Sequence, residues 1–274
     1  MTMSTVKLPQ AELERALASR PKHVFISGAS RGIGEAVARL LGEEQAFRFT
    51  LAARSYNQTL AVAMDIGTDR AQAVRLDLED EESIDNAVVA AETRFGPIDV
   101  LILNAGINLP TPVSDNSAAA RVAFRKVMQT NVIGTWFLAQ RAAEHMAHGG
   151  RILFIASVLA RFGAPGVSAY AASKHALMGL VRSMALELAG RGIRVNAVNP
   201  GWVDTEMAHD SLARMAAARG VTAAQQTQEA LAVLPIKRMV KPAEVASYLK
   251  FLIGPGGECI TGQGIDISCG SVMV

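Results

Sequence analysis

Short apolar runs alternate with stretches of helical periodicity along most of this 274-residue chain. This alternation restricts the possible folds strongly, because consecutive strand–helix units build a parallel sheet that helices cover. The sequence therefore predicts an α/β fold with a doubly wound, parallel seven-stranded sheet and helices on both faces. The predicted strands are 24–26, 49–53, 73–76, 98–103, 152–156, 194–198 and 265–267.

Helical patterns fill most of the intervals between these runs. We expect helices at about 33–41, 79–94, 117–145 and 170–189, and a further helix that begins near Pro242. No repeat or linker divides the chain, so we expect one domain over 21–274. Residues 1–20 are predicted to be an N-terminal extension, with a short amphipathic helix around 12–17.

Composition excludes several classes of protein. Half of the residues are hydrophobic and 19% are charged, so a large core can form and disorder is not expected. The net charge of +2 comes without a basic cluster, which argues against a nucleic-acid partner. No apolar stretch reaches the roughly 18 residues of a membrane span. We expect a soluble, cytoplasmic protein whose two cysteines, Cys259 and Cys269, are reduced and packed.

A glycine-rich segment, residues 27–34, joins the first predicted strand to the first predicted helix. Glycines there permit a tight turn and let the backbone approach a diphosphate, whose charge the helix N-terminus stabilises. The spacing is Gly-x-x-x-Gly-x-Gly, which differs from the commoner Gly-x-Gly-x-x-Gly. The position between strand and helix favours a dinucleotide site over a purely structural turn.

The end of the second predicted strand bears on which dinucleotide is bound. An acidic residue there would hydrogen-bond the ribose 2′-hydroxyl of NAD, but this chain has Arg54 followed by Ser55. Arg31 lies inside the glycine turn, and two guanidinium groups can pair with a phosphate in fork geometry. NADP is therefore favoured, although NAD remains possible and Arg54 could be a solvated strand end.

Tyr170 and Lys174 are one helical turn apart and are predicted to share a face of their helix. A tyrosine hydroxyl has a pKa near 10, and an ammonium group close by is expected to lower that pKa. Such a pair can exchange a proton near neutral pH, as the interconversion of a carbonyl and an alcohol requires. Tyr-x-x-x-Lys is common in helices, so its significance depends on the surrounding motifs.

These motifs follow one another along the chain in the order 27–34, Asp77-Leu78, Asn104-Ala-Gly106, Asn131-Val-Ile-Gly134, Ser157, Tyr170-Ala-Ala-Ser-Lys174, Arg194-Val-Asn196, Pro200-Gly201 and Thr261-Gly-Gln263. Each is weak alone, but the ordered series resembles the short-chain dehydrogenase/reductase family, in its single-domain, 3-oxoacyl-acyl-carrier-protein-reductase-like branch. The likeness covers about 22–270. It implies a Rossmann fold and reversible, NAD(P)-linked hydride transfer between a ketone and a secondary alcohol.

The resemblance also implies roles for particular residues. Tyr170 would give or take the proton, Lys174 would lower its pKa and hold the nicotinamide ribose, and Ser157 would bond the substrate oxygen. Asn131 would sustain a water path to the lysine. The candidate cofactor-binding residues are Gly28, Ser30, Arg31, Gly32, Ile33, Gly34, Arg54, Asp77, Leu78, Asn104, Ala105, Gly106, Tyr170, Lys174, Pro200, Gly201, Val203 and Thr205.

We expect an NADP(H)-dependent oxidoreductase, with reduction favoured. One alternative is an NAD-linked alcohol dehydrogenase, and another is a non-catalytic, nucleotide-sensing module on the same fold. The substrate would be a small carbonyl or alcohol, and 3-oxoacyl thioesters, cyclic ketones and sugar-derived carbonyls all remain open. The segments 158–168 and 203–238 should define it, and neither is expected to supply an arginine clamp. No metal site is expected. The resemblance implies a homotetramer or homodimer, with the helices around 117–147 and 169–190 as the contact surfaces.

Overall fold

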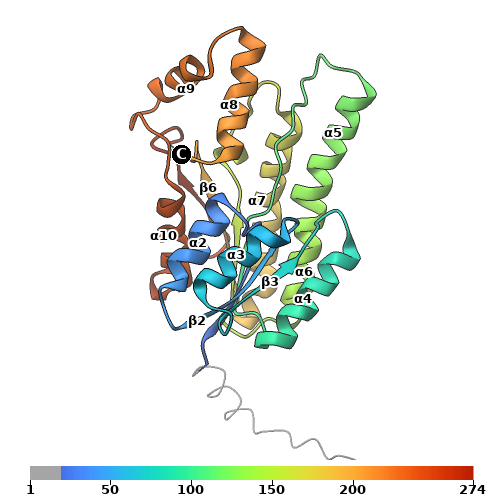
Figure 1. Cartoon of the computed structure of the whole chain (residues 1–274), viewed down its shortest axis with the longest axis vertical. Helices are drawn as coiled ribbons and strands as arrows, with labels where there is room; N and C mark the ends of the chain where they lie inside the picture. The colour runs from blue at the N-terminus through green and yellow to red at the C-terminus, as the bar shows by residue number, and fades with distance from the viewer. Residues whose placement is uncertain (1–19, 274) are drawn as a thin grey trace, which may run out of the picture.

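The computed structural model describes residues 20–273, and the predicted helix around 12–17 lies outside the described residues. Seven parallel strands form one sheet in the order β3-β2-β1-β4-β5-β6-β7 (Figure 1). This confirms the predicted fold, and every predicted strand overlaps an observed one. The strands are β1 Lys22–Ser27, β2 Phe47–Ala53, β3 Ala71–Arg75, β4 Val100–Leu103, β5 Arg151–Ile155, β6 Arg194–Pro200 and β7 Gly264–Ile267.

Helices cover both faces of the sheet, as expected for strands that are apolar on both sides. Side chains of the central strands alternate between two cores: Phe25 packs with α4, α6 and α7, while Val24 and Ile26 pack with α2, α3 and α10. The α-helices are α2 Gly32–Gly42, α3 Tyr56–Ile66, α4 Glu81–Phe95, α5 Ala118–Met128, α6 Thr135–His145, α7 Ser168–Leu188, α8 Glu206–Arg219, α9 Ala223–Ala232 and α10 Pro242–Ile253. No helix within 20–273 is long and apolar enough to cross a membrane.

The helix predicted over 117–145 is interrupted by a π-helical segment, Gln129–Gly134, between α5 and α6. Its last residue packs against the loop after β3, where a Cβ on Gly134 would lie 1.8 Å from the Leu78 carbonyl oxygen. Asn131 lies within this segment. Single π-helical turns are frequently found at functional sites.

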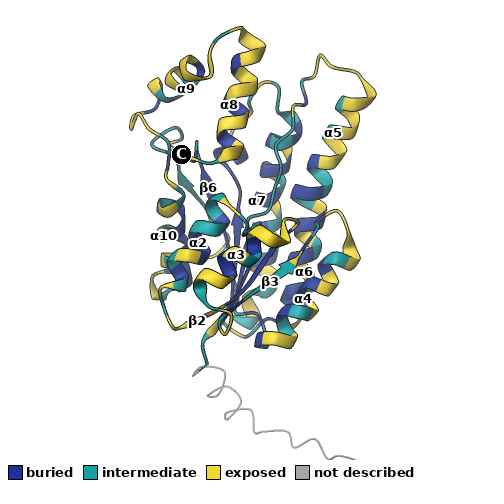
Figure 2. Cartoon of the chain, viewed as in Figure 1, coloured by how far each residue is buried: buried dark blue, intermediate teal, exposed yellow. Residues whose placement is uncertain are grey.

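Three helices were not predicted. α3 begins with polar residues after Ser55, and its helical period is weak in the sequence. α8 and α9 occupy the alanine-rich stretch 205–235, where alanine favours helix and Thr222 with Gln225 forms a capping box. Both lie beyond one end of the sheet, and their outward surfaces are largely exposed (Figures 1 and 2).

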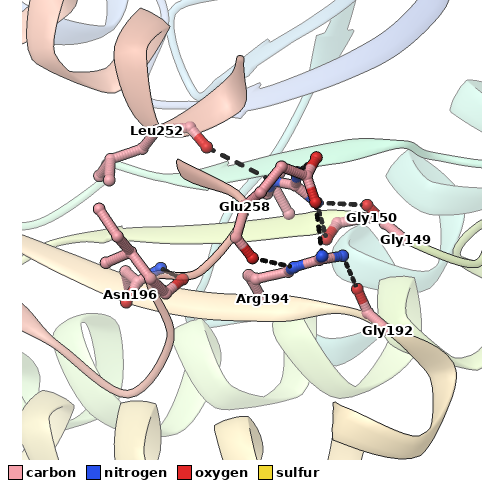
Figure 3. A network of polar contacts seen from close by, with 9 residues as sticks. Gly149, Gly150, Gly192, Arg194, Asn196, Leu252 and Glu258 are labelled. Atoms are coloured by element: carbon pink, nitrogen blue, oxygen red, sulfur yellow. Dashed lines mark hydrogen bonds and ion pairs between the residues drawn. The ribbon is translucent and has the colours of Figure 1, made fainter. Parts of the chain in front are cut away.

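A polar network ties the strands together at the opposite end of the sheet. Arg151 is buried at the start of β5, and its Nη2 lies 2.6 Å from Glu258 Oε1. The Nη2 of Arg194, which begins β6, lies 2.5 Å from Glu258 Oε2, and Arg194 Nε donates to the Glu258 carbonyl oxygen at 3.0 Å (Figure 3). Arg20 is anchored nearby, because its Nη1 lies 2.7 Å from Asp99 Oδ2.

Candidate active site

A cavity of about 1510 Å³ opens at the carboxyl ends of the strands. Strand order reverses between β1 and β4, and parallel α/β sheets bind ligands in the crevice at such a switch point. The cavity is larger than the roughly 300–1,000 Å³ of a typical small-molecule pocket. It therefore has room for a dinucleotide and a second molecule.

The glycine turn forms one wall of this cavity. Gly28 has a φ of +69°, and a Cβ there would lie 2.9 Å from both Ala105 Cα and Asn104 Nδ2. A Cβ on Gly34 would lie 2.3 Å from the Gly28 carbonyl oxygen. These contacts require glycine at both positions. The N-terminus of α2 faces the cavity, and no side chain caps it, so backbone N–H groups are available to a diphosphate.

Asn104, which directly follows β4, stabilises the glycine turn through hydrogen bonds. Its Nδ2 donates to the carbonyl oxygens of Ser27 and Gly28, at 3.1 and 2.9 Å. Ser27 Oγ in turn accepts from the backbone N–H groups of Asn104 and Ala105, at 3.1 and 3.2 Å. Asn104 thus bonds the loop that follows β1, and it also lines the cavity.

Cationic and hydroxyl groups lie at the end of β2. Arg54 and Ser55 line the cavity, and Arg54 forms no ion pair with any residue of 20–273. Ser55 precedes α3 without a capping bond from its side chain. Arg31 also lines the cavity, but its Nη1 lies 2.5 Å from Glu206 Oε2. Free donors without a carboxylate fit a 2′-phosphate better than a 2′-hydroxyl.

Ser157, Tyr170 and Lys174 lie on the same cavity. Ser157 lies two residues after the end of β5, and its Oγ accepts from the Leu159 N–H at 3.1 Å. Tyr170 and Lys174 occupy the first turns of α7, with Lys174 Nζ 5.4 Å from the tyrosine ring centroid. Lys174 Nζ donates to the Ile155 carbonyl oxygen at 2.8 Å, which fixes the ammonium group at the end of β5.

The predicted effect of Lys174 on Tyr170 is wrong for this state of the protein. Burial raises the pKa of Tyr170 to about 12, and a polar contact with Ser157 opposes the rise. Burial also lowers the pKa of Lys174 to about 8. A dry environment disfavours the phenolate and the ammonium alike, and this outweighs their attraction. Tyr170 is therefore held as a protonated donor.

Asn131 is buried behind this wall. Its Oδ1 accepts from the Ile107 N–H at 2.8 Å, and its Nδ2 donates to the Ile107 carbonyl oxygen at 2.9 Å and to Ser173 Oγ at 3.1 Å. A Cβ on Gly106 would lie 3.3 Å from Asn131 Oδ1 and 3.7 Å from Lys174 Nζ. The asparagine thus lies close to the lysine and joins the π-helical segment to the loop after β4.

All candidate residues line the cavity except Asn131 and Gly34, which support it from behind. The apolar residues Trp202, Met207 and Met215 also line it, whereas Leu212 and Met239 do not. Sequence reasoning missed several polar lining residues because they belong to no recognised motif. They are Asn108, Thr130, Ser211 and Arg214.

The two cysteines lie outside the cavity. No group of three or more potential metal ligands was found within 20–273. Cys259 and Cys269 are both free, but Cys259 is exposed, so the expectation of a packed pair was wrong. The exposed cysteine follows Glu258 on the loop before β7.

Fold and cavity together define a dinucleotide-binding oxidoreductase of the Rossmann class. The family model of short chain dehydrogenases matches residues 22–216. The chain therefore belongs to the short-chain dehydrogenase family, which confirms the resemblance and the expected NAD(P)-dependent interconversion of a ketone and an alcohol.

Three similar proteins illustrate the range of relatives. The chain is 32% identical to 3-oxoacyl-(acyl-carrier-protein) reductase FabG of Vibrio cholerae, over 92% of this chain and 98% of that protein. It is 34% identical to cis-4-hydroxycyclohexanecarboxylate dehydrogenase of Sinomonas cyclohexanicum, over 91% and 96%. A short chain dehydrogenase of Burkholderia cenocepacia, solved in complex with NADP, superposes with a TM-score of 0.79 at 32% identity, over 92% and 98%.

Proposed function

We propose that this protein reduces a ketone to a secondary alcohol with NADPH. The observation that carries the proposal is that Ser157, Tyr170 and Lys174 share one cavity with the glycine turn and the unpaired Arg54. A proton donor, an oxygen-binding hydroxyl and a phosphate-binding wall thereby meet at one place. The relatives named as a 3-oxoacyl reductase and a hydroxycyclohexanecarboxylate dehydrogenase both act on a carbon–oxygen bond.

Each residue has a distinct proposed task. Tyr170 donates its proton to the carbonyl oxygen as negative charge develops there, and Ser157 donates a hydrogen bond to the same oxygen. Lys174, held by Ile155, provides positive charge beside the tyrosine. Asn131 positions the loop after β4 through its two bonds to Ile107. When bound, NADPH supplies the hydride.

NADPH rather than NADH is supported by the charge at the end of β2. Arg54 and Ser55 would hold the 2′-phosphate, and the uncapped N-terminus of α2 would hold the diphosphate. Tyr170 is protonated and can therefore supply the proton that reduction consumes. The Burkholderia cenocepacia relative was solved with NADP, which agrees with this assignment.

Substituting Tyr170→Phe tests the proposal. NADPH oxidation with a panel of ketones should fall by roughly a hundredfold or more, because the proton donor is lost. NADPH binding, followed by its fluorescence, should remain within about twofold of the wild type, since the aromatic ring stays in place. Unchanged turnover in the variant would refute the assignment. If the wild type binds NADPH but reduces none of the ketones, a nucleotide sensor is favoured instead.

Two broader expectations also remain proposals. We propose a homo-oligomer, supported by exposed apolar side chains on α5, the π-helical segment and α6: Val122, Phe124, Ile133 and Trp136. We also propose a cytoplasmic location, supported by the two free cysteines, one of them exposed.

A further inference from the structure

α8 presents one face to the cavity that also contains the proposed reaction site. The residues on this face are spaced by three or four positions, as one side of a helix requires: Met207, Ser211, Arg214 and Ala218. The same cavity is also lined by apolar side chains, among them Leu159, Phe162, Trp202 and Met215. Arg214 therefore brings a positive charge to a largely apolar surface.

Arg214 is held in place. Its Nη2 donates to the carbonyl oxygen of Asn108 at 3.4 Å and to Ser211 Oγ at 3.1 Å. Ser211 is buried, donates to the Met207 carbonyl oxygen at 2.7 Å and accepts from Asn108 Nδ2 at 3.3 Å. The guanidinium group is thus tied both to its own helix and to the loop after β4. This arrangement orients the group without using all five of its N–H donors.

The charge of Arg214 is not neutralised within residues 20–273, since no carboxylate there forms an ion pair with it. The acidic groups that line the cavity near α8 have other partners. Asp204 Oδ1 lies 2.7 Å from His209 Nε2, and Glu206 is paired with Arg31. Among the cationic lining residues, Arg39 is paired with Glu35, and Lys174 is bonded to Ile155. Only Arg54 and Arg214 keep an unpaired guanidinium group on the described wall of the cavity.

Arg54 belongs to the proposed cofactor site at the end of β2, so Arg214 remains available to bind the second molecule. We infer that the substrate carries an anionic oxygen group, a carboxylate or a phosphate, that Arg214 binds while the carbonyl lies against Ser157 and Tyr170. Arginine binds either group with charge-assisted hydrogen bonds. The sequence did not reveal this residue, because no motif surrounds it, and the inference departs from the expectation of no arginine clamp in 203–238. The inference rests on the proposed function of the same cavity.

The test compares charged and neutral forms of one ketone in the full-length enzyme with NADPH. One pair is 4-oxocyclohexanecarboxylate and its methyl ester, and the other is acetoacetyl-coenzyme A and acetoacetyl-N-acetylcysteamine. Arg214→Gln should lower the charged-to-neutral ratio of kcat/KM by roughly tenfold in one pair, with Arg214→Lys in between. A response in the first pair identifies a carboxylate close to the carbonyl, and a response in the second identifies a phosphate on a carrier arm.

Arg48→Gln is the matched control, because Arg48 is an exposed arginine at the other end of β2 and does not line the cavity. It should leave both ratios unchanged. Ratios unaffected by Arg214→Gln, or an equal loss for the charged and neutral forms, would overturn the inference and leave the proposed function standing. If no ketone oxidises NADPH, the proposed function fails, and calorimetric binding of the two charged compounds decides the inference: equal binding by wild type and Arg214→Gln overturns it.

Discussion

Burial shifts the pKa values of Tyr170 and Lys174 in opposite directions. The pKa of Tyr170 rises to about 12, and that of Lys174 falls to about 8, in both cases because the cavity wall desolvates the charged form. Tyr170 therefore stays protonated across the physiological range. Lys174 is the group that titrates within it.

This difference predicts the pH dependence of reduction. Below about pH 8 the lysine is an ammonium ion and the tyrosine a phenol, so kcat/KM should be level. Above about pH 8 Lys174 loses its charge, and kcat/KM should fall by about tenfold per pH unit. The measurement is initial NADPH oxidation at low ketone concentration from about pH 6 to about pH 10. An increase in kcat/KM between pH 8 and 10 would contradict the assignment.

Cofactor choice is also decided at the scale of one residue. Arg54→Asp should weaken NADPH binding by roughly 10- to 100-fold, because a charge-assisted bond to the 2′-phosphate is replaced by repulsion. NADH binding should stay level or improve, since a carboxylate can accept from the 2′-hydroxyl. Fluorescence titration with both cofactors measures the change. Arg75→Asp is a suitable control, because Arg75 pairs with Ala53 across the sheet yet lies outside the cavity. An unchanged preference in Arg54→Asp would count against Arg54 as the residue that binds the 2′-phosphate.

At the scale of elements, Glu258 joins two strands to the loop before β7. Its pKa is lowered, first by the charge of Arg151 and also by that of Arg194. Arg151 is buried, and burial lowers its own pKa, so the guanidinium group depends on this carboxylate and on nearby carbonyl oxygens, including those of Leu252 and Gly150 (Figure 3). Loss of the carboxylate would leave a buried charge less compensated.

Glu258→Gln should therefore lower the melting temperature by roughly 2–4 °C, a modest effect because Glu258 itself is largely exposed. Glu229→Gln is the control: Glu229 pairs with Arg219, but both side chains are about half exposed. That substitution should change the melting temperature by less than about 1 °C. Since the network lies at the end of the sheet away from the cavity, kcat/KM should be unaltered in both variants. Equal melting temperatures for Glu258→Gln and the control would show that the network is not stabilising.

For the whole molecule, the exposed apolar residues of α5–α6 predict self-association. Light scattering should give a mass at least twice the 29.0 kDa of one chain. Phe124→Lys combined with Trp136→Asp should reduce that mass, because both side chains are at least one-third exposed and the charges would oppose burial in an interface. Leu186 on α7 is also exposed, and Leu186→Lys tests whether that helix takes part in the interface as well. A monomeric wild type would refute the proposed oligomer.

Features that depend on local sequence patterns were predicted well, and features without such a pattern were missed. The strands, the glycine turn and the Tyr170–Lys174 pair are local patterns, and all were found in the predicted order. α8 and α9 were missed because alanine-rich, polar sequence shows little periodicity. The π-helical segment at Asn131 was missed because it depends on packing of Gly134 against Leu78, a contact between distant parts of the chain.

The sequence by itself determined the fold class and the glycine turn, and it supplied the proposed reacting side chains, because each depends on residue type and short-range spacing. Only the tertiary structure decided the protonation states of Tyr170 and Lys174, since desolvation depends on everything that surrounds a group. It also decided which charges remain unpaired in the cavity. Arg31 and Arg54 look equivalent in sequence, but folding places Glu206 against the first, whereas no residue of 20–273 forms an ion pair with the second. Arg214, which belongs to no motif in the sequence, is brought to the wall of the cavity by the same long-range packing.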